Sequence, residues 1–134
     1  MHFDAVFISP NTKIKYPFSE LGLAPEVGSS YLLFQALGYQ QAAQLLFQSK
    51  TIDGTKYYEL GLAKYVGDDF LNQAKSYALE LKEQSLSSII ETKAILKSFM
   101  SEELAKARSM ETKAMKKLFG SEDNLKAVEK FFNK

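Results

Sequence analysis

PFSELGLAPEVGSS, residues 17–30, is the most informative stretch of this sequence. It places one carboxylate, Glu26, between Pro25 and the apolar Val27, directly ahead of the apolar residues that follow Gly28. Because proline restricts the backbone, we expect Glu26 to be held on a stiff turn, in an apolar pocket at the start of a buried helix. That is a workable setting for a general base. The alternative is that Glu26 only complements the helix dipole.

The residues around this stretch predict short strands followed by helices. Short apolar or alternating runs within residues 5–16 and 62–66 indicate strands. Residues 28–37 are apolar on nearly every side, which predicts a buried helix that ends at Gly38. Residues 40–48 predict a second helix, with apolar residues on one face and glutamines elsewhere.

The composition changes near residue 67. All three prolines and six of the seven glycines fall within residues 1–67. Residues 68–134 instead repeat apolar side chains at steps of three and four among Lys and Glu, which predicts amphipathic helices from residue 68 onward. The expected N-caps of three of these helices are Ser85, Ser101 and Ser121.

The composition of the 134 residues is typical of one soluble globular domain. Hydrophobic residues make up 46% and charged residues 25%. The 17 basic and 16 acidic residues leave a net charge of +1, too small to attract nucleic acid. The sequence has no cysteine and one histidine, His2, so we expect no disulfide, no metal site and no Ser-His catalytic triad.

No segment predicts secretion or membrane insertion. The N-terminus has neither the basic region nor the long apolar run of a signal peptide. The longest apolar cluster, at residues 31–34, is far shorter than a membrane span. We therefore expect a cytoplasmic protein without nucleic-acid or membrane partners.

These motifs together resemble the crotonase superfamily of enoyl-CoA hydratases and isomerases. Residues 17–30 carry the most specific likeness. Supporting motifs along the chain are Asp4-Ala5, Gly38 with Ala42-Ala43, Gly61-Leu62 with Val66, and the series Glu111, Leu118, Ser121-Glu122-Asp123, Ala127 and Phe131-Phe132. Two positions depart from the family pattern, since Ser49 stands where the family usually has glycine and Tyr57 where it usually has alanine.

The resemblance covers nearly the whole chain and corresponds to about the second half of a crotonase domain. It implies an α/β crotonase-like fold, of which this is the helix-rich C-terminal part. Residues 1–67 would form the C-terminal part of the crotonase core and residues 68–134 a C-terminal helical layer for oligomerisation. The first half of the family domain supplies the oxyanion-hole donors. We therefore expect the isolated chain not to isomerise substrates at a family-like rate.

Within the superfamily, residues 17–30 look most like the peroxisomal-type Δ3,Δ2-enoyl-CoA isomerases of fatty-acid β-oxidation. The glutamate of their Pro-Glu pair is the catalytic base, which corresponds to Glu26. Hydratases use a second glutamate at the position of Phe18, so hydration is disfavoured here. The implied substrate is an acyl-CoA thioester bound beside Phe18, Leu21 and Pro25, with no metal and no cofactor, because coenzyme A is part of the substrate.

The resemblance also implies a homo-oligomer, a trimer or hexamer, formed through residues 101–132. Two alternatives remain open. One is a non-catalytic, acyl-CoA-binding or oligomerising crotonase-like fragment. The other is a different crotonase reaction, such as thioester hydrolysis.

Overall fold

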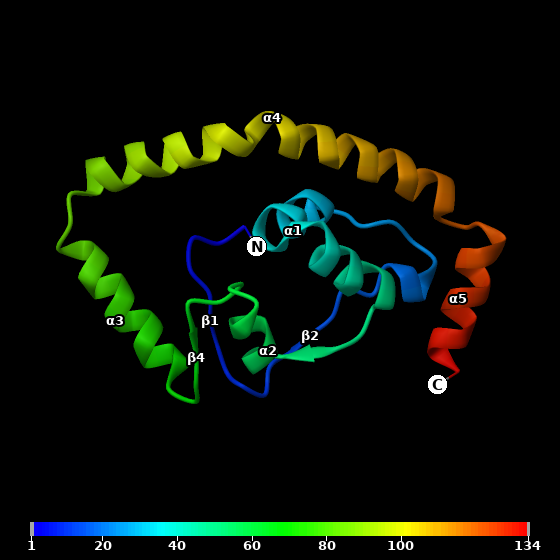
Figure 1. Cartoon of the computed structure of the whole chain (residues 1–134), viewed down its shortest axis with the longest axis horizontal. Helices are drawn as coiled ribbons and strands as arrows, with labels where there is room; N and C mark the ends of the chain where they lie inside the picture. The colour runs from blue at the N-terminus through cyan, green and yellow to red at the C-terminus, as the bar shows by residue number, and fades with distance from the viewer. Residues whose placement is uncertain (1, 134) are drawn as a thin grey trace. The chain divides into compact units, whose positions relative to one another are not determined.

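The computed structural model describes residues 2–133, which are mainly helical with four two-residue strands (Figure 1). In chain order the elements are β1 (Phe7–Ile8), β2 (Lys13–Ile14), the 3₁₀ turn η1 (Ser19–Leu21), α1 (Ser29–Gln48), β3 (Ile52–Asp53), α2 (Gly54–Glu59), β4 (Tyr65–Val66), α3 (Phe70–Lys82), α4 (Leu86–Leu118) and α5 (Glu122–Phe132).

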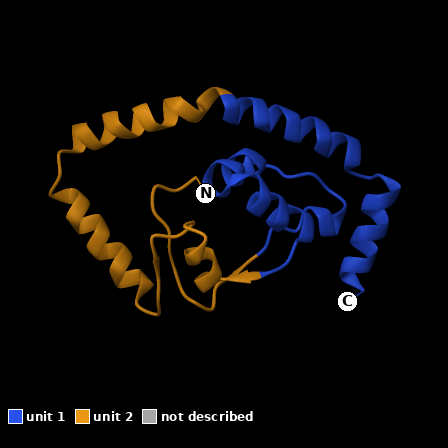
Figure 2. Cartoon of the chain, in the orientation of Figure 1, with its two compact units in different colours: residues 1, 15–51, 103–134 blue, residues 2–14, 52–102 orange. Residues whose placement is uncertain are grey.

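The described residues divide into two compact units, shown in two colours in Figure 2. Unit 1 contains residues 15–51 and 103–133, and unit 2 contains residues 2–14 and 52–102. Helix α4 changes unit after residue 102, so its first part belongs to unit 2 and its second part to unit 1.

Unit 2 is organised by two short strand pairs. Strand β1 runs parallel to β4, with Phe7 opposite Tyr65, and β2 runs antiparallel to β3, with Ile14 opposite Ile52. Helix α3 packs against β1, where the Tyr77 ring centroid lies 5.6 Å from that of Phe7. Aromatic pairs at this separation add specific contact energy to the burial of apolar area.

The strands expected within residues 5–16 and 62–66 are confirmed, as are the helices from residue 68 onward. Strand β3 was not predicted, because its second residue, Asp53, precedes Gly54, and this pair is typical of a turn or helix start. Tyr57, the bulky departure from the family pattern, is buried on α2 and contributes to the core of unit 2.

The core of unit 1 is built on α1. Gly38, with φ of 73° and ψ of 170°, interrupts the helical backbone as expected. The expectation that residues 28–37 are buried on nearly every side is wrong for this chain. Leu32 and Leu33 are buried, whereas Phe34 is 48% exposed. Within residues 2–133, α1 therefore buries one face and leaves another open to solvent.

Two of the three expected helix caps are confirmed. The Ser85 hydroxyl accepts a hydrogen bond from the Ser88 N–H at 3.4 Å, and the Ser121 hydroxyl accepts one from the Asn124 N–H at 3.2 Å. The expected cap at Ser101 is wrong, because α4 continues through this position without a break. The Ser101 hydroxyl instead donates within the helix, to a carbonyl three residues earlier.

Asn124, near the start of α5, connects that helix to η1. Its side chain is 4% exposed, and its Nδ2 donates to the Leu21 carbonyl at 2.6 Å. Its Oδ1 accepts from the Gly120 N–H at 2.9 Å. The two elements are so close that a Cβ on Gly22 would lie 2.9 Å from the Asn124 Cα. Glycine, with a φ of 64° here, suits both the close approach and the left-handed backbone.

Replacing Asn124 with alanine should lower the free energy of unfolding by about 1–3 kcal/mol, because the Leu21 carbonyl and the Gly120 N–H lose their partner. Denaturant unfolding followed by circular dichroism measures this change. Asn72→Ala is the matched control, since Asn72 is exposed on α3, and its effect should stay within about 0.5 kcal/mol. Equal effects of the two variants would contradict the connecting role of Asn124.

Candidate functional site

Residues 26–29 form a tight turn that leads into α1. The Ser29 N–H donates to the Glu26 carbonyl at 3.0 Å, which closes the turn. Its two central residues, Val27 and Gly28, both have positive φ, at 58° and 78°. Positive φ at both central positions is characteristic of type I′ turns.

Val27 is an unusual residue for this backbone conformation. A β-branched side chain in the left-handed region is a genuine outlier, and such strain costs about 1–3 kcal/mol. Val27 is 59% exposed, so burial of its side chain offers little compensation. Strain of this kind persists where surrounding contacts determine the conformation, and it is concentrated at functional sites.

The buried carboxylate of Glu111, on α4, holds the turn from one side. Glu111 is 6% exposed, and its Oε2 accepts a hydrogen bond from the Gly28 N–H at 2.6 Å. Its Oε1 accepts from the Ser30 N–H at 3.0 Å and from the Ser30 hydroxyl at 2.6 Å. Gly28, at the N-cap position of α1, has no side-chain acceptor, so Glu111 supplies the acceptors that the first helical N–H groups lack.

Sequence reasoning noted Glu111 only as part of the family resemblance and missed this role. A signal was present in the pattern of α4. The residues that face inward in unit 1 recur at steps of three and four, and a glutamate occupies the middle of an otherwise apolar series: Leu104, Ala107, Glu111, Ala114 and Leu118. A charged residue at a core position needs a buried partner.

The upstream part of residues 17–30 is held by hydrogen bonds within unit 1. The Ser19 hydroxyl donates to the Leu46 carbonyl at 2.7 Å, and the Glu20 N–H donates to the Ser49 hydroxyl at 3.3 Å. Ser49 has a φ of 49°, in the left-handed region that glycine, the residue expected here from the family resemblance, adopts without strain. Here the buried serine hydroxyl adds a contact that glycine lacks.

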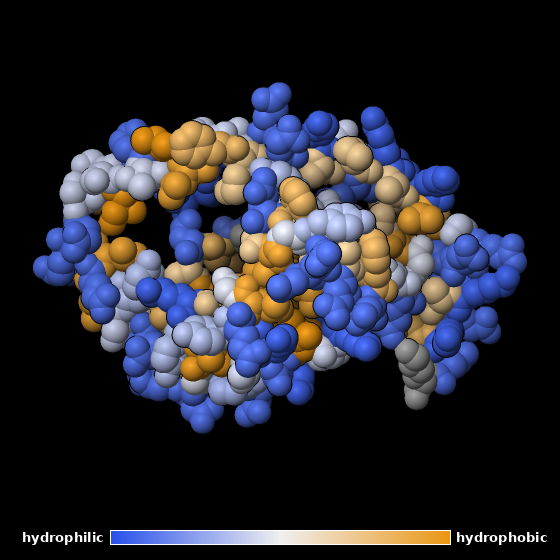
Figure 3. All heavy atoms as spheres, viewed as in Figure 1, coloured by the Kyte–Doolittle hydropathy of each residue, from blue (hydrophilic) through white to orange (hydrophobic). Residues whose placement is uncertain are grey.

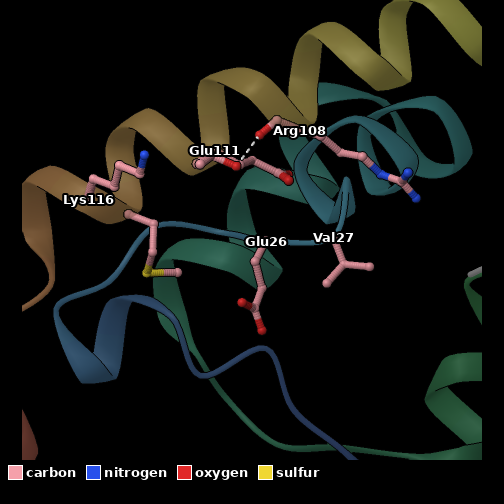
Figure 4. Close-up of a pocket in the computed structure, with 7 residues that line it drawn as sticks. Glu26, Val27, Arg108, Glu111 and Lys116 are labelled. Carbon is pink, nitrogen blue, oxygen red and sulfur yellow. Dashed lines mark hydrogen bonds between the residues drawn. The ribbon is translucent and has the colours of Figure 1, made fainter.

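Glu26 itself is exposed, so the expectation of an apolar pocket around its carboxylate is wrong for residues 2–133. Figure 4 shows the Glu26 carboxylate pointing away from Glu111. A cavity of about 300 Å³ adjoins the turn in unit 1. It is lined by Glu26, Val27, Arg108, Glu111, Thr112, Met115 and Lys116.

The other predicted site residues lie on the same segment. Phe18, Leu21 and Pro25 are all half-buried. The backbone carbonyl of Leu21 is engaged by Asn124, and that of Phe18 accepts from the Leu23 N–H at 2.8 Å. The four predicted site residues therefore lie on one segment that hydrogen bonds hold in place, with Glu26 at its exposed tip.

Outside this segment, a shifted pKa is found in unit 2. In unit 2 the Lys93 ammonium donates a hydrogen bond to the exposed Asp4 carboxylate, and this bond lowers the pKa of Asp4 below its ordinary value.

Within residues 2–133 there is no cluster of His, Cys, Asp and Glu suited to a metal ion. Over the same residues, every helix is too short or too polar to cross a membrane.

Comparison with known proteins identifies the family. A family model described as enoyl-CoA hydratase/isomerase matches residues 1–134. The chain belongs to the enoyl-CoA hydratase/isomerase family. Its crotonase-like fold is confirmed by the structure of Pseudomonas aeruginosa OdaA, which is 31% identical and superposes with a TM-score of 0.91 over 99% of this chain and 55% of OdaA.

Curated members of the enoyl-CoA hydratase/isomerase family match in sequence. A Bacillus subtilis protein named as an enoyl-CoA hydratase/isomerase is 29% identical over 133 residues, 98% of this chain and 52% of its own length. The Delta(3,5)-Delta(2,4)-dienoyl-CoA isomerase of Pyricularia oryzae is 33% identical over 86 residues, 64% of this chain and 30% of its own length. The chain spans about half the length or less of these relatives.

Replacing Val27 with asparagine, a residue that tolerates positive φ, should raise the free energy of unfolding by about 1 kcal/mol. Denaturant unfolding measures the gain. Val27→Thr is the matched control, because it keeps the β-branched shape and should leave stability unchanged. A loss of stability in Val27→Asn, or an equal gain in both variants, would show that Val27 is unstrained.

Proposed function

We propose that this chain carries the catalytic base of a Δ3,Δ2-enoyl-CoA isomerase of fatty-acid β-oxidation, and that Glu26 is that base. The observation that carries this proposal is the presentation of Glu26. Its carboxylate is exposed at the tip of a segment that hydrogen bonds hold on both sides, from Glu111 downstream and from Asn124 and Ser49 upstream. A rigid backbone that presents one carboxylate is suited to moving a proton between two carbons.

In the proposed reaction, Glu26 removes a proton from C2 of a 3-enoyl-CoA thioester. The electron pair of the broken C–H bond forms C1=C2 while the carbonyl π electrons move onto the thioester oxygen, which gives a dienolate. When the oxygen re-forms the carbonyl, the C1=C2 electrons shift to form C2=C3 and the electrons of C3=C4 take the proton at C4. The proton that Glu26 accepted is the one it returns, so one carboxylate completes the cycle. The dienolate intermediate requires oxyanion donors, worth about 3–4 kcal/mol each, which by family resemblance come from the N-terminal half of a crotonase domain.

Phe18 supports isomerisation over hydration. It stands where hydratases of the family have their second glutamate, and a phenyl ring cannot activate water. The half-buried side chains of Phe18, Leu21 and Pro25 offer apolar contacts for the acyl part of the substrate near Glu26. The relative named as a dienoyl-CoA isomerase adds support, because it places isomerases among the proteins that this chain resembles.

Glu26→Gln should abolish isomerisation without unfolding the protein. Glutamine keeps the size and polarity of the side chain but cannot accept the proton, so the rate should fall by at least roughly 10²–10⁴-fold. Stability should change by no more than about 1 kcal/mol. The measurement is conversion of a 3-enoyl-CoA to the 2-enoyl-CoA by this chain joined to the N-terminal half of a crotonase domain.

Glu20→Gln is the matched control for this assay. Glu20 lies on the same segment, but its carboxylate forms an ion pair with Lys15, so this variant should retain activity. Near-normal turnover by Glu26→Gln would remove Glu26 from the mechanism. Loss of activity in Glu20→Gln alone would assign the base to Glu20 instead.

The alternative of an oligomerising, non-catalytic fragment is favoured by exposed apolar side chains. Tyr39 and Phe47 on α1 are 70% and 69% exposed, in addition to Phe34. Figure 3 shows hydrophobic residues open at the surface among hydrophilic ones. Stable monomers rarely leave large apolar patches uncovered. We therefore propose that the chain assembles with further copies of itself, whether or not it is catalytic.

Sedimentation velocity should show self-association of the chain that increases with concentration, together with binding of a hydrophobic dye. Phe47→Gln should weaken association, because it removes an exposed apolar ring from α1. Gln44→Ala, a change at an exposed polar residue of the same helix, is the control and should leave association unchanged. A single monomeric species without dye binding would contradict the proposed assembly.

A further inference from the structure

Both oxygens of the buried Glu111 carboxylate accept hydrogen bonds from the turn that carries Glu26. All three of its hydrogen bonds come from Gly28 and Ser30, which follow Glu26 by two and four residues. A buried carboxylate is strongly unfavourable unless hydrogen bonds satisfy it. Bonds from N–H and O–H groups to an ionised carboxylate are shorter and stronger than neutral ones. The interaction is therefore both strong and directed at one short backbone segment.

The position of Gly28 relative to α4 reinforces this restraint. A Cβ on Gly28 would lie 2.3 Å from the Leu104 Cδ1, so the turn backbone is packed directly against α4. The Glu26 carbonyl is fixed by a hydrogen bond from the N–H of Ser29, the residue that follows Gly28. Val27, between these fixed points, keeps a strained positive φ. Strained backbone persists when its surroundings over-determine the conformation, and the Glu111 carboxylate provides such a restraint.

We propose that Glu111 is a positioning residue for the isomerase reaction: by bonding Gly28 and Ser30 it sets the conformation of residues 26–28 and so the direction of the Glu26 carboxylate. This inference rests on the proposed role of Glu26. Glu111 acts through the backbone, and the Glu26 carboxylate points away from it, as Figure 4 shows. A misplacement of a reacting group by about 1 Å can reduce a rate by roughly 10²-fold.

Three variants test the restraint at different strengths. Glu111→Gln keeps the shape of the side chain but replaces one acceptor oxygen with an NH₂ group, which cannot accept a hydrogen bond. At least one of the three bonds from Gly28 and Ser30 is therefore lost. Glu111→Asp keeps the charge and both oxygens on a shorter side chain. Ser30→Ala removes only the hydroxyl bond at 2.6 Å, and it is the variant that should fold in every case.

Two matched controls accompany these variants. Ser29→Ala changes the neighbouring serine, whose buried hydroxyl oxygen has no hydrogen-bond partner among the described residues. Glu102→Gln makes the same chemical change as Glu111→Gln at an exposed position of the same helix. Both controls should behave like the unaltered chain.

The first readout is amide hydrogen exchange of this chain, followed residue by residue by NMR, which needs no activity. In Glu111→Gln the amides of Gly28 and Ser30 should exchange roughly ten- to hundredfold faster, as expected when a charged hydrogen bond is lost. The Leu32 amide, which bonds the Gly28 carbonyl within α1, should change much less. A uniform increase throughout unit 1 would mean general destabilisation and would overturn the positioning role.

The second readout is isomerisation by the chain joined to the N-terminal half of a crotonase domain. Glu111→Gln should lower kcat by roughly 10²-fold with little change in KM. Glu111→Asp should recover part of the loss, and Ser30→Ala should lower kcat less than Glu111→Gln. Faster exchange at Gly28 and Ser30 with an unchanged kcat would overturn the positioning role.

The Glu26→Gln result separates the two proposals. If Glu26→Gln is inactive while Glu111→Gln keeps full activity, Glu26 remains the base and the positioning role of Glu111 fails. If Glu26→Gln retains near-normal turnover, the proposed base is wrong, and the exchange of the Gly28 and Ser30 amides still decides whether Glu111 sets the turn.

Discussion

The hydrogen bonds between the Glu111 carboxylate and the N-terminus of α1 are the interaction on which unit 1 depends. Helix α1 has a glycine, Gly28, at its N-cap position, so its first N–H groups have no side-chain acceptor nearby in the sequence. Glu111 supplies that acceptor from α4, and its negative charge also complements the positive end of the helix dipole. The Glu111 carboxylate therefore caps α1, has its own buried oxygens satisfied, and joins α1 to α4 through residues that lie 81 and 83 positions apart in the chain.

The same interaction shapes the segment that carries Glu26. Residues 17–30 are held upstream by Asn124 and Ser49 and downstream by Glu111, while Glu26 lies at an exposed tip between these points. Hydrogen bonds on both sides leave the chain little freedom to move, and they keep Val27 in its strained conformation. The result is a carboxylate with a defined backbone and a side chain open to a partner molecule.

Unit 1 leaves apolar surface exposed in a chain that spans about half the length of its relatives. Helix α1 exposes aromatic side chains on one face, and Glu26 has no apolar pocket within residues 2–133. Burial of apolar area is the main favourable term in association, so these faces are suited to covering by further protein. Membership of the enoyl-CoA hydratase/isomerase family, and a TM-score of 0.91 with OdaA over 99% of this chain, show that these residues have the crotonase-like fold.

The sequence by itself determined the family, the strands within residues 5–16 and 62–66, the helical character from residue 68 onward, the break at Gly38 and the caps at Ser85 and Ser121. These follow from local patterns, because turn residues, caps and apolar periodicity act over a few neighbouring positions. It could also single out Glu26, since the Pro-Glu pair ahead of an apolar run is visible in the letters alone.

Only the tertiary structure decided which groups hold that segment in place. Glu111 and Asn124 meet residues 17–30 across 81 to 103 positions of chain, and no local pattern reports a contact between such distant residues. The exposure of Glu26 and of Phe34 likewise depended on which faces other parts of the chain cover, which the apolar pattern of α1 does not encode. Burial and long-range hydrogen bonding are properties of the assembled fold, and for that reason the expected pocket and the cap at Ser101 were wrong while the helical character of residues 68 onward was right.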